Sequence, residues 1–224
     1  MKPFTAGLRR LHASTRGVAM LEFAFVLPIV VLMSLGGAEL TNYITVKMRI
    51  SQIALQIADN AARMGNGTAT QAKQVTETDI NDLFIGAQME SDGLDLRTNG
   101  RVILSNLETR VAGATDFKIK WQRCYGLKSY ASSYGVTNDI KTAGMGPTGR
   151  EVKAQDSTPT MFVEIYYVYK PVVSVTIART LGLTSTASAP TMTQIASMSV
   201  RDRRDITGGT NGIYNSAGAP VANC

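Results

Sequence analysis

The hydrophobic pattern of the chain predicts one long amino-terminal helix. Residues 18–40 form an apolar run of 23 residues that is interrupted only by Glu22 and Glu39. A helix of about 20 residues crosses the ~30 Å hydrocarbon core of a bilayer, so this run predicts a transmembrane segment. Apolar residues then recur at spacings of three and four as far as Met64, and Gly65-Asn66-Gly67 ends the pattern. The helix is expected to cover residues 18–64, about 70 Å at 1.5 Å per residue.

The outer part of this helix, residues 41–64, is amphipathic. It alternates an apolar stripe with polar residues such as Lys47, Asp59 and Arg63. We expect the stripe to pack on the domain that follows, residues 65–224. A coiled-coil dimer is the alternative, although only about two heptads are apolar.

Beyond the helix, the period of the hydrophobic pattern changes from helical to strand-like. A short helix is predicted at residues 78–89, with Thr76 or Thr78 as its cap. Four segments rich in β-forming residues alternate with a period of two, at residues 101–110, 115–123, 160–173 and 191–201. The expected fold is α+β: a long amino-terminal helix packed on a small, mostly antiparallel sheet.

Two segments lack such patterns: the Gly/Ser/Tyr-rich residues 124–159 and the Gly/Asn-rich tail 206–224. A loop of about 35 residues is unusual in a compact domain unless it is functional or tied down. The only two cysteines are Cys124, which opens the loop, and Cys224. A disulfide between them is expected in an oxidising compartment. Free thiols or an intermolecular bond are the alternatives.

The charge distribution argues against a nucleic-acid partner. The formal net charge is +6, from 23 Lys and Arg against 17 Asp and Glu. Four of the basic residues, Lys2, Arg9, Arg10 and Arg16, lie in residues 1–17, which contain no acid. Without this leader the balance is 19 − 17 = +2. Basic residues ahead of the apolar run predict a cytoplasmic amino terminus and a periplasmic domain.

The side chains needed for common catalytic and metal sites are scarce. The only histidine, His12, lies in the leader, and the two cysteines do not form a CxxC motif, so we expect no enzyme, no cofactor and no Cys/His metal site. Residues 144–149 match G-x-G-x-x-G but lack the strand and helix of a dinucleotide site, which favours a surface loop. The remaining acids, including Glu77, Glu108 and Glu164, are interpreted as solvated surface charges, and the charge run 201–205 as a solvated strand end.

Three interpretations of the amino-terminal segment compete. They are a secretory signal cut after Ala38, an uncleaved signal anchor, and a prepilin-type signal. Glu22 lies where a carboxylate costs about 3 kcal/mol on insertion, which suggests that the residue has a use. A Glu that only snorkels to the interface is the alternative.

The segment Arg16-Gly17-Val18-Ala19-Met20-Leu21-Glu22-Phe23 resembles the type IVb prepilin signal, in which a peptidase cuts after Gly and leaves Glu at the fifth position of the mature chain. The wider stretch of about 50 residues looks like the TadE/TadG-like minor pseudopilins of the tight-adherence (Flp) pilus system. The resemblance implies cleavage after Gly17. The new amine of Val18 would then lie four residues from Glu22, on one helical face.

The resemblance also implies a function and a set of partners. The chain would be a minor pilin-like subunit that assembles through its amino-terminal helix, with Glu22, Pro28 and Glu39 inside the contact region. Pro28 would loosen the helix, or would simply be tolerated. Its partners would be the lipid bilayer, the prepilin peptidase, other pilin subunits and the inner-membrane assembly platform. An uncleaved, membrane-tethered binding or adhesion module is the alternative, and a secreted enzyme is a third hypothesis.

Overall fold

The computed structural model describes residues 17–68, 70–180, 182 and 188–224. The chain divides into two compact units, which we describe separately. The helical unit comprises Met1–Tyr43 and Pro171–Ser185. The sheet unit comprises Ile44–Lys170 and Thr186–Cys224.

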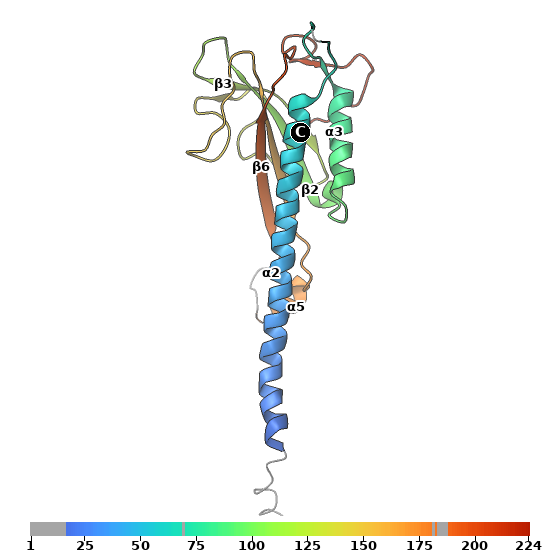
Figure 1. The fold of residues 1–224 in the computed structure, drawn as a ribbon, viewed down its shortest axis with the longest axis vertical. Coiled ribbons are helices and arrows are strands. Elements are labelled where there is room, and N and C mark those ends of the chain that lie inside the picture. The colour runs from blue at the N-terminus through green and yellow to red at the C-terminus, as the bar shows by residue number, and fades with distance from the viewer. Residues whose placement is uncertain (1–16, 69, 181, 183–187) are drawn as a thin grey trace, which may run out of the picture. The chain divides into compact units, whose positions relative to one another are not determined.

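The long helix expected from the sequence is α2, Val18–Arg63 (Figure 1). Its 46 residues differ from the expected 18–64 by one position. The helix continues without a break through Pro28, whose missing N–H leaves the carbonyl of Ala24 without its usual intrahelical donor. In the helical unit the side chains of α2 are almost all exposed, and the unit also contains the short helix α5, Val175–Thr180, which the sequence pattern did not predict.

A five-stranded antiparallel sheet forms the centre of the sheet unit. Its central strand β2 (Gly100–Thr109) pairs with β3 (Phe117–Tyr125) on one side and with β5 (Thr160–Val168) on the other. The sheet is completed by β6 (Thr191–Ser199) beside β5 and by the short β4 (Ile140–Lys141) beside β3. The expected α+β class and all four expected strands are confirmed.

The third expected strand is shorter than predicted. It was expected over residues 160–173, but β5 ends at Val168. One further ladder bond joins the amide of Tyr169 to the carbonyl of Pro190, at 2.9 Å. Pro171 then follows and has no amide hydrogen to continue the ladder.

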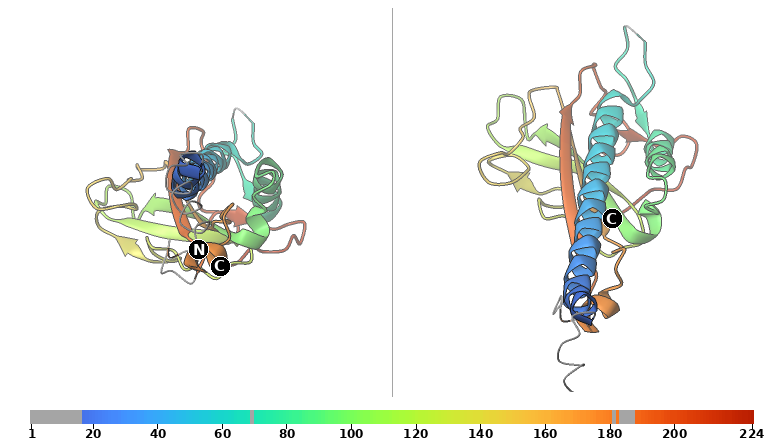
Figure 2. Two further views of the ribbon diagram at one scale, coloured as in Figure 1. Left: turned by 90° about the horizontal axis from the view of Figure 1, so that it is seen from below. Right: turned by 60° about the horizontal axis from the view of Figure 1, so that its bottom comes forward.

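Two helices cover one face of this sheet (Figure 2). The outer half of α2 buries an apolar stripe that includes Ile50, Ile53 and Ile57. Beside it lies α3 (Glu77–Glu90), capped by Thr76 in a capping box with Asp79, so Thr76 is the cap of the two candidates. The rings of Phe84 and Tyr125 stack with their centroids 5.6 Å apart, which joins α3 to β3. After α3 a single helical turn, α4 (Leu96–Asn99), leads into β2.

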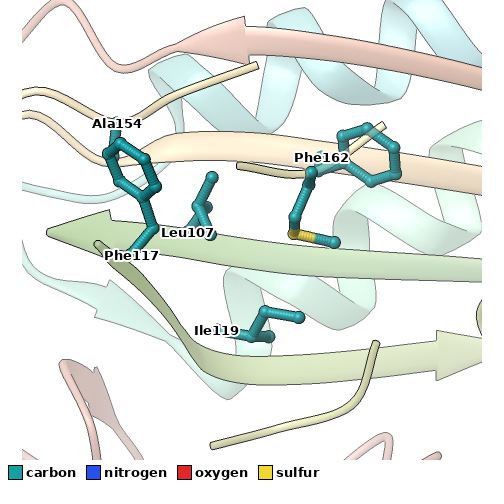
Figure 3. Packing of buried hydrophobic residues seen from close by; sticks show 6 residues of the cluster. Leu107, Phe117, Ile119, Ala154 and Phe162 are labelled. Atoms are coloured by element: carbon teal, nitrogen blue, oxygen red, sulfur yellow. The ribbon is translucent and has the colours of Figure 1, made fainter. Parts of the chain in front are cut away.

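The opposite face of the sheet is covered by the long connection between β3 and β5. Figure 3 shows the buried cluster on this face, in which Leu107, Phe117, Ile119 and Phe162 come from the strands or their ends. Met145 and Ala154 come from the connection itself. Residues 126–159 therefore form part of the core.

The carboxyl-terminal tail is also fixed to the domain. Its short strand β7 (Ile213–Tyr214) pairs in parallel with β1 (Val75–Thr76), immediately before α3. Further along, the amide of Cys124 donates to the carbonyl of Ala222 at 2.8 Å. The tail thus contacts both the start of α3 and the end of β3.

Candidate functional site

The residues of the expected cleavage signal lie at the first turn of α2. Arg16 lies outside the described residues. Gly17 is the residue immediately before the helix, and Val18 is its first residue. Gly17 is in 3₁₀ conformation, so the peptide bond between Gly17 and Val18 joins a 3₁₀ residue to the first residue of α2. Its amide is one of the amino-terminal N–H groups that have no intrahelical acceptor.

Glu22 and Phe23 follow on the same exposed helix. Glu22 lies one turn after Val18, and both side chains are exposed in this single chain. The spacing of four residues places them on one face of α2, as expected from the sequence. No cation in the described residues forms an ion pair with Glu22.

The remainder of the apolar run presents a continuous apolar surface. The segment is long and apolar enough to cross a membrane once, and none of its apolar window is buried within the chain. Ser34 and Thr41 satisfy their hydroxyls on backbone carbonyls one turn earlier, Val30 at 2.8 Å and Gly37 at 2.9 Å. These bonds remove two polar hydrogens from a surface that otherwise consists mainly of hydrocarbon.

Glu39, at the outer end of the run, is part-buried. Its carboxylate accepts a hydrogen bond from the backbone amide of Val173, at 3.0 Å, within the helical unit. The structure therefore gives Glu39 a local contact with the segment before α5. Glu22 and Pro28 remain on exposed parts of the helix.

The two cysteines form an intramolecular disulfide. Cys124 and Cys224 lie 100 positions apart in sequence, and their Cα atoms are 4.9 Å apart. The bond fixes the tail to the end of β3. This is the pairing expected from the sequence.

Several charged residues expected on the surface are buried. Glu77 is the first residue of α3 and forms a bidentate ion pair with Arg123 of β3, whose Nε lies 2.9 Å from Oε2. Glu108 of β2 accepts a hydrogen bond from Asn106 at 2.6 Å, and burial raises the pKa of its carboxyl. The expectation of solvated charges is therefore wrong for both residues, because each has a partner that permits burial.

Glu164 is a third buried acid, and it is held by neutral donors. It accepts hydrogen bonds from the hydroxyls of Tyr130 at 2.6 Å and Ser132 at 2.8 Å, and from the amide of Ser133. The ring of Tyr130 also stacks on Tyr166 with centroids 4.4 Å apart. Burial and the neighbouring carboxylate together raise the pKa of Tyr130. Glu164 thereby fixes the start of the long connection to β5.

Arg204 belongs to the charge run that was expected to be solvated, but its side chain caps the carboxyl-terminal end of α2. Its Nη2 donates to the carbonyl oxygens of Ala61 at 2.8 Å and Met64 at 3.1 Å. Burial lowers the pKa of the guanidinium to about 10. The expectation is wrong for this residue because the last carbonyls of a helix attract a cation. Arg201 and Arg203 of the same charge run are exposed, as expected from the sequence.

The glycines of the G-x-G-x-x-G match lie in a loop of the long connection, but Met145 between them is buried in the core, so the loop is only partly on the surface. Gly144 has a φ of +109°, and a Cβ there would lie 2.2 Å from the carbonyl oxygen of Val152. Met145 pairs with Val152 in an isolated bridge. These glycines therefore serve a tight backbone turn. In the part of the chain that the structure describes, no group of three or more His, Cys, Asp or Glu side chains is arranged to hold a metal ion.

The structure thus combines an apolar amino-terminal helix of membrane-spanning length with an antiparallel sheet on which the outer half of that helix packs. Comparison with protein families gives a match to part of this helix-containing region. Residues 17–65 match the model of the TadE-like protein family, so the match begins at Gly17 and ends two residues after α2. It covers 49 of the 224 residues. No curated protein and no solved structure matches the chain.

Proposed function

We propose that this protein is a minor pilin-like subunit of a Tad (tight-adherence) pilus system. In this proposal the chain is inserted in the inner membrane with its amino terminus in the cytoplasm and its sheet unit in the periplasm. A prepilin peptidase then removes residues 1–17, and the mature chain assembles with other pilin subunits through α2. The single observation that carries the proposal is that the TadE-like match begins at Gly17, the residue directly before the first residue of α2.

The position of the Gly17–Val18 bond supports the processing step. A peptidase needs an extended or loosened backbone at the bond that it cuts, and this bond lies at the amino-terminal end of α2, where the 3₁₀ residue Gly17 meets the first α-helical residue and helices fray most easily. After cleavage, the amine of Val18 and the carboxylate of Glu22 are available to pair with each other or with a neighbouring subunit. Each charge is costly in lipid when it is alone, so pairing lowers the cost of keeping both.

The amino-terminal residue of the mature protein tests the proposal. We expect mass spectrometry of the protein purified from membranes to identify Val18. Met1 would instead support an uncleaved membrane tether, and Glu39 a secreted protein cut after Ala38.

Substitution of Gly17 gives a second test with a matched control. Gly17→Ala is expected to leave a full-length precursor in the membrane, because the peptidase signal requires glycine at this position. Gly36→Ala is the control, because a Cβ at Gly36 of the same helix would also meet no atom within 4 Å. Normal cleavage of the Gly17 variant would refute the proposed processing.

Glu22→Gln separates processing from assembly. The variant keeps the shape of the side chain but has no charge to pair with the Val18 amine. We expect it to be cleaved and to enter filaments poorly. Incorporation equal to that of the wild type would argue against a role of the charge.

A further inference from the structure

A groove runs between α2 and α3 on the outer surface of the sheet unit. The two helices lie side by side on the sheet and run in opposite directions (Figures 1 and 2). The main part of the groove has a volume of about 370 Å³, and its floor includes Ile57, Leu83 and Ala87. A second hollow of about 110 Å³ shares Gln56 and Glu90 with the first, so the groove is continuous along both helices.

The α3 side of the groove is acidic. Asp82 and Glu90 line it and are exposed. Neither has an ion-pair or hydrogen-bond partner among the residues that the structure describes. Between them lies Gly86, which lets another chain approach the helix backbone closely. Arg49 of α2 lines the second hollow together with Glu90, so acids outnumber cations along the groove but do not stand alone in it. An apolar floor with an excess of acid fits an occupant with apolar side chains and a basic residue.

The same chain carries a surface of that chemistry on α2. Three large apolar side chains project from the outer half of the helix although they do not face the core: Ile44, Met48 and Leu55, which are 46%, 58% and 52% exposed. Their spacings of four and seven place them in one row, which we call the α2 ridge. Lys47 lies beside this row, is exposed, and forms no ion pair with any described residue.

The α2 ridge and the groove lie on different flanks of one helix. Adjacent helical residues are about 100° apart around the axis, so Leu55 of the ridge and Gln56 of the groove point in different directions. A contact between the ridge of one copy and the groove of the next is therefore heterologous. Such a contact leaves a free ridge and a free groove at the two ends, and it can repeat along a filament.

We propose that the α2 ridge of one copy of this chain docks into the α2–α3 groove of a second copy. The inference rests on the proposed function, in that both copies enter one membrane in the same direction and their α2 helices run parallel. In this arrangement Leu55 lies against Gly86, and Lys47 faces Glu90 of the neighbouring copy. Lys47 lies eight helical steps, about 12 Å, from Leu55, and Glu90 lies four steps, about 6 Å, from Gly86, so the extended Lys47 side chain bridges the remaining distance of about 6 Å.

Cysteine cross-linking between two differently tagged full-length copies tests the contact. One copy carries Leu55→Cys and the other Gly86→Cys, while the natural Cys124 and Cys224 remain paired with each other. We expect a mixed disulfide dimer in membranes. Two controls are expected to give little cross-linked dimer. One pairs Leu55→Cys with itself, and the other pairs Leu55→Cys with Ile140→Cys on the remote strand β4. A mixed pair that cross-links no better than these controls would overturn the proposal.

A charge exchange tests the pairing of Lys47 with Glu90. Lys47→Glu in the Leu55→Cys copy, or Glu90→Lys in the Gly86→Cys copy, is expected to reduce the cross-linked fraction about tenfold, since like charges then face each other. Both changes together are expected to restore it. Equal yields in all four combinations would contradict the pairing.

A blocked groove separates this inference from the proposed function. Gly86→Trp fills the groove, and a Cβ at this position meets no atom within 4 Å, so the fold is expected to persist. Ile85→Trp is the matched control, because Ile85 is exposed on the same turn outside the groove. We expect the Gly86 variant to be cleaved normally but to lose co-purification with a second tagged copy. Normal co-purification of the Gly86 variant would overturn the groove contact and leave the processing proposal intact. An uncleaved wild-type chain would refute the proposed function, independently of the result for the groove variants.

Discussion

Arg204 donates a hydrogen bond to the carbonyl oxygen of Ala61 at 2.8 Å, across 143 positions of sequence. This bond and its companion to Met64 give a charged donor to one carbonyl in the last turn of α2 and to another just beyond the end of the helix. The end of the long helix is thus satisfied by a residue from the tail.

Removing this donor is expected to destabilise the sheet unit. Arg204→Leu leaves the buried carbonyl of Ala61 and the part-buried carbonyl of Met64 without this donor, and loss of bonds to a charged group costs about 2–3 kcal/mol. Urea unfolding of the detergent-solubilised protein measures the loss. Arg203→Leu, which changes an exposed neighbour, is expected to shift the midpoint little. Similar midpoints for the two variants would contradict the capping role.

Glu108 is expected to make stability depend on pH. Burial raises its pKa above the value of 4.5 that it has in the unfolded chain, although Lys120 and Asn106 oppose the shift. The folded protein therefore holds this proton more tightly. The resulting stability is fully present below pH 4.5 and is lost as the pH rises through the raised pKa, at about 1.4 kcal/mol for each unit of difference.

Glu108→Gln removes that titration and is expected to flatten the profile of unfolding free energy between pH 4.5 and 7.5. Glu90→Gln, on the exposed surface, serves as the control. An unchanged profile in the Glu108 variant would mean that its carboxyl does not titrate in this range.

The disulfide is expected to contribute strongly to stability. Its partners are 100 positions apart, and a crosslink over a loop of that length constrains the unfolded chain by about 4–5 kcal/mol at most. Cys224→Ser should lower the unfolding midpoint, and reductant should lower that of the wild type to the same value. If reductant has no effect on the wild type, the bond does not stabilise the fold.

Glu164 is expected to hold residues 130–133 against β5. Glu164→Ala removes the acceptor shared by Tyr130, Ser132 and Ser133. We expect limited proteolysis to cut this segment faster, with the disulfide-bonded core intact. Tyr130→Phe removes one of the bonds and keeps the ring on Tyr166, so its effect should be smaller. Cleavage rates equal to that of the wild type would show that other contacts hold the segment.

Local sequence signals predicted the parts of the fold that depend on neighbouring residues. The apolar run and the Gly65-Asn66-Gly67 terminator predicted α2 to within one residue. The start of α3, expected at residue 78 with Thr76 or Thr78 as cap, was also predicted to within one residue. The expected pairing of Cys124 with Cys224 followed from there being only two cysteines.

The buried charges depend on partners far away in the sequence. Glu77 meets Arg123 46 positions later, and Glu164 meets Tyr130 34 positions earlier. No local pattern distinguishes such an acid from a solvated one, because alternation along a strand shows only which face a residue occupies. The core role of the β3–β5 connection was missed for the same reason, since Met145 and Ala154 are isolated apolar residues in a polar segment.

The order of strands in the sheet has a consequence for how the domain folds. β2 can form a hairpin with β3 as soon as both are available, but its other edge must wait for β5, which starts 160 − 109 = 51 residues after β2 ends. Pairing between such distant segments is slow, typically milliseconds to seconds in β-rich domains. During that interval one edge of the central strand stays open to other chains. Mispairing between two chains is therefore easiest between formation of the β2–β3 hairpin and the arrival of β5.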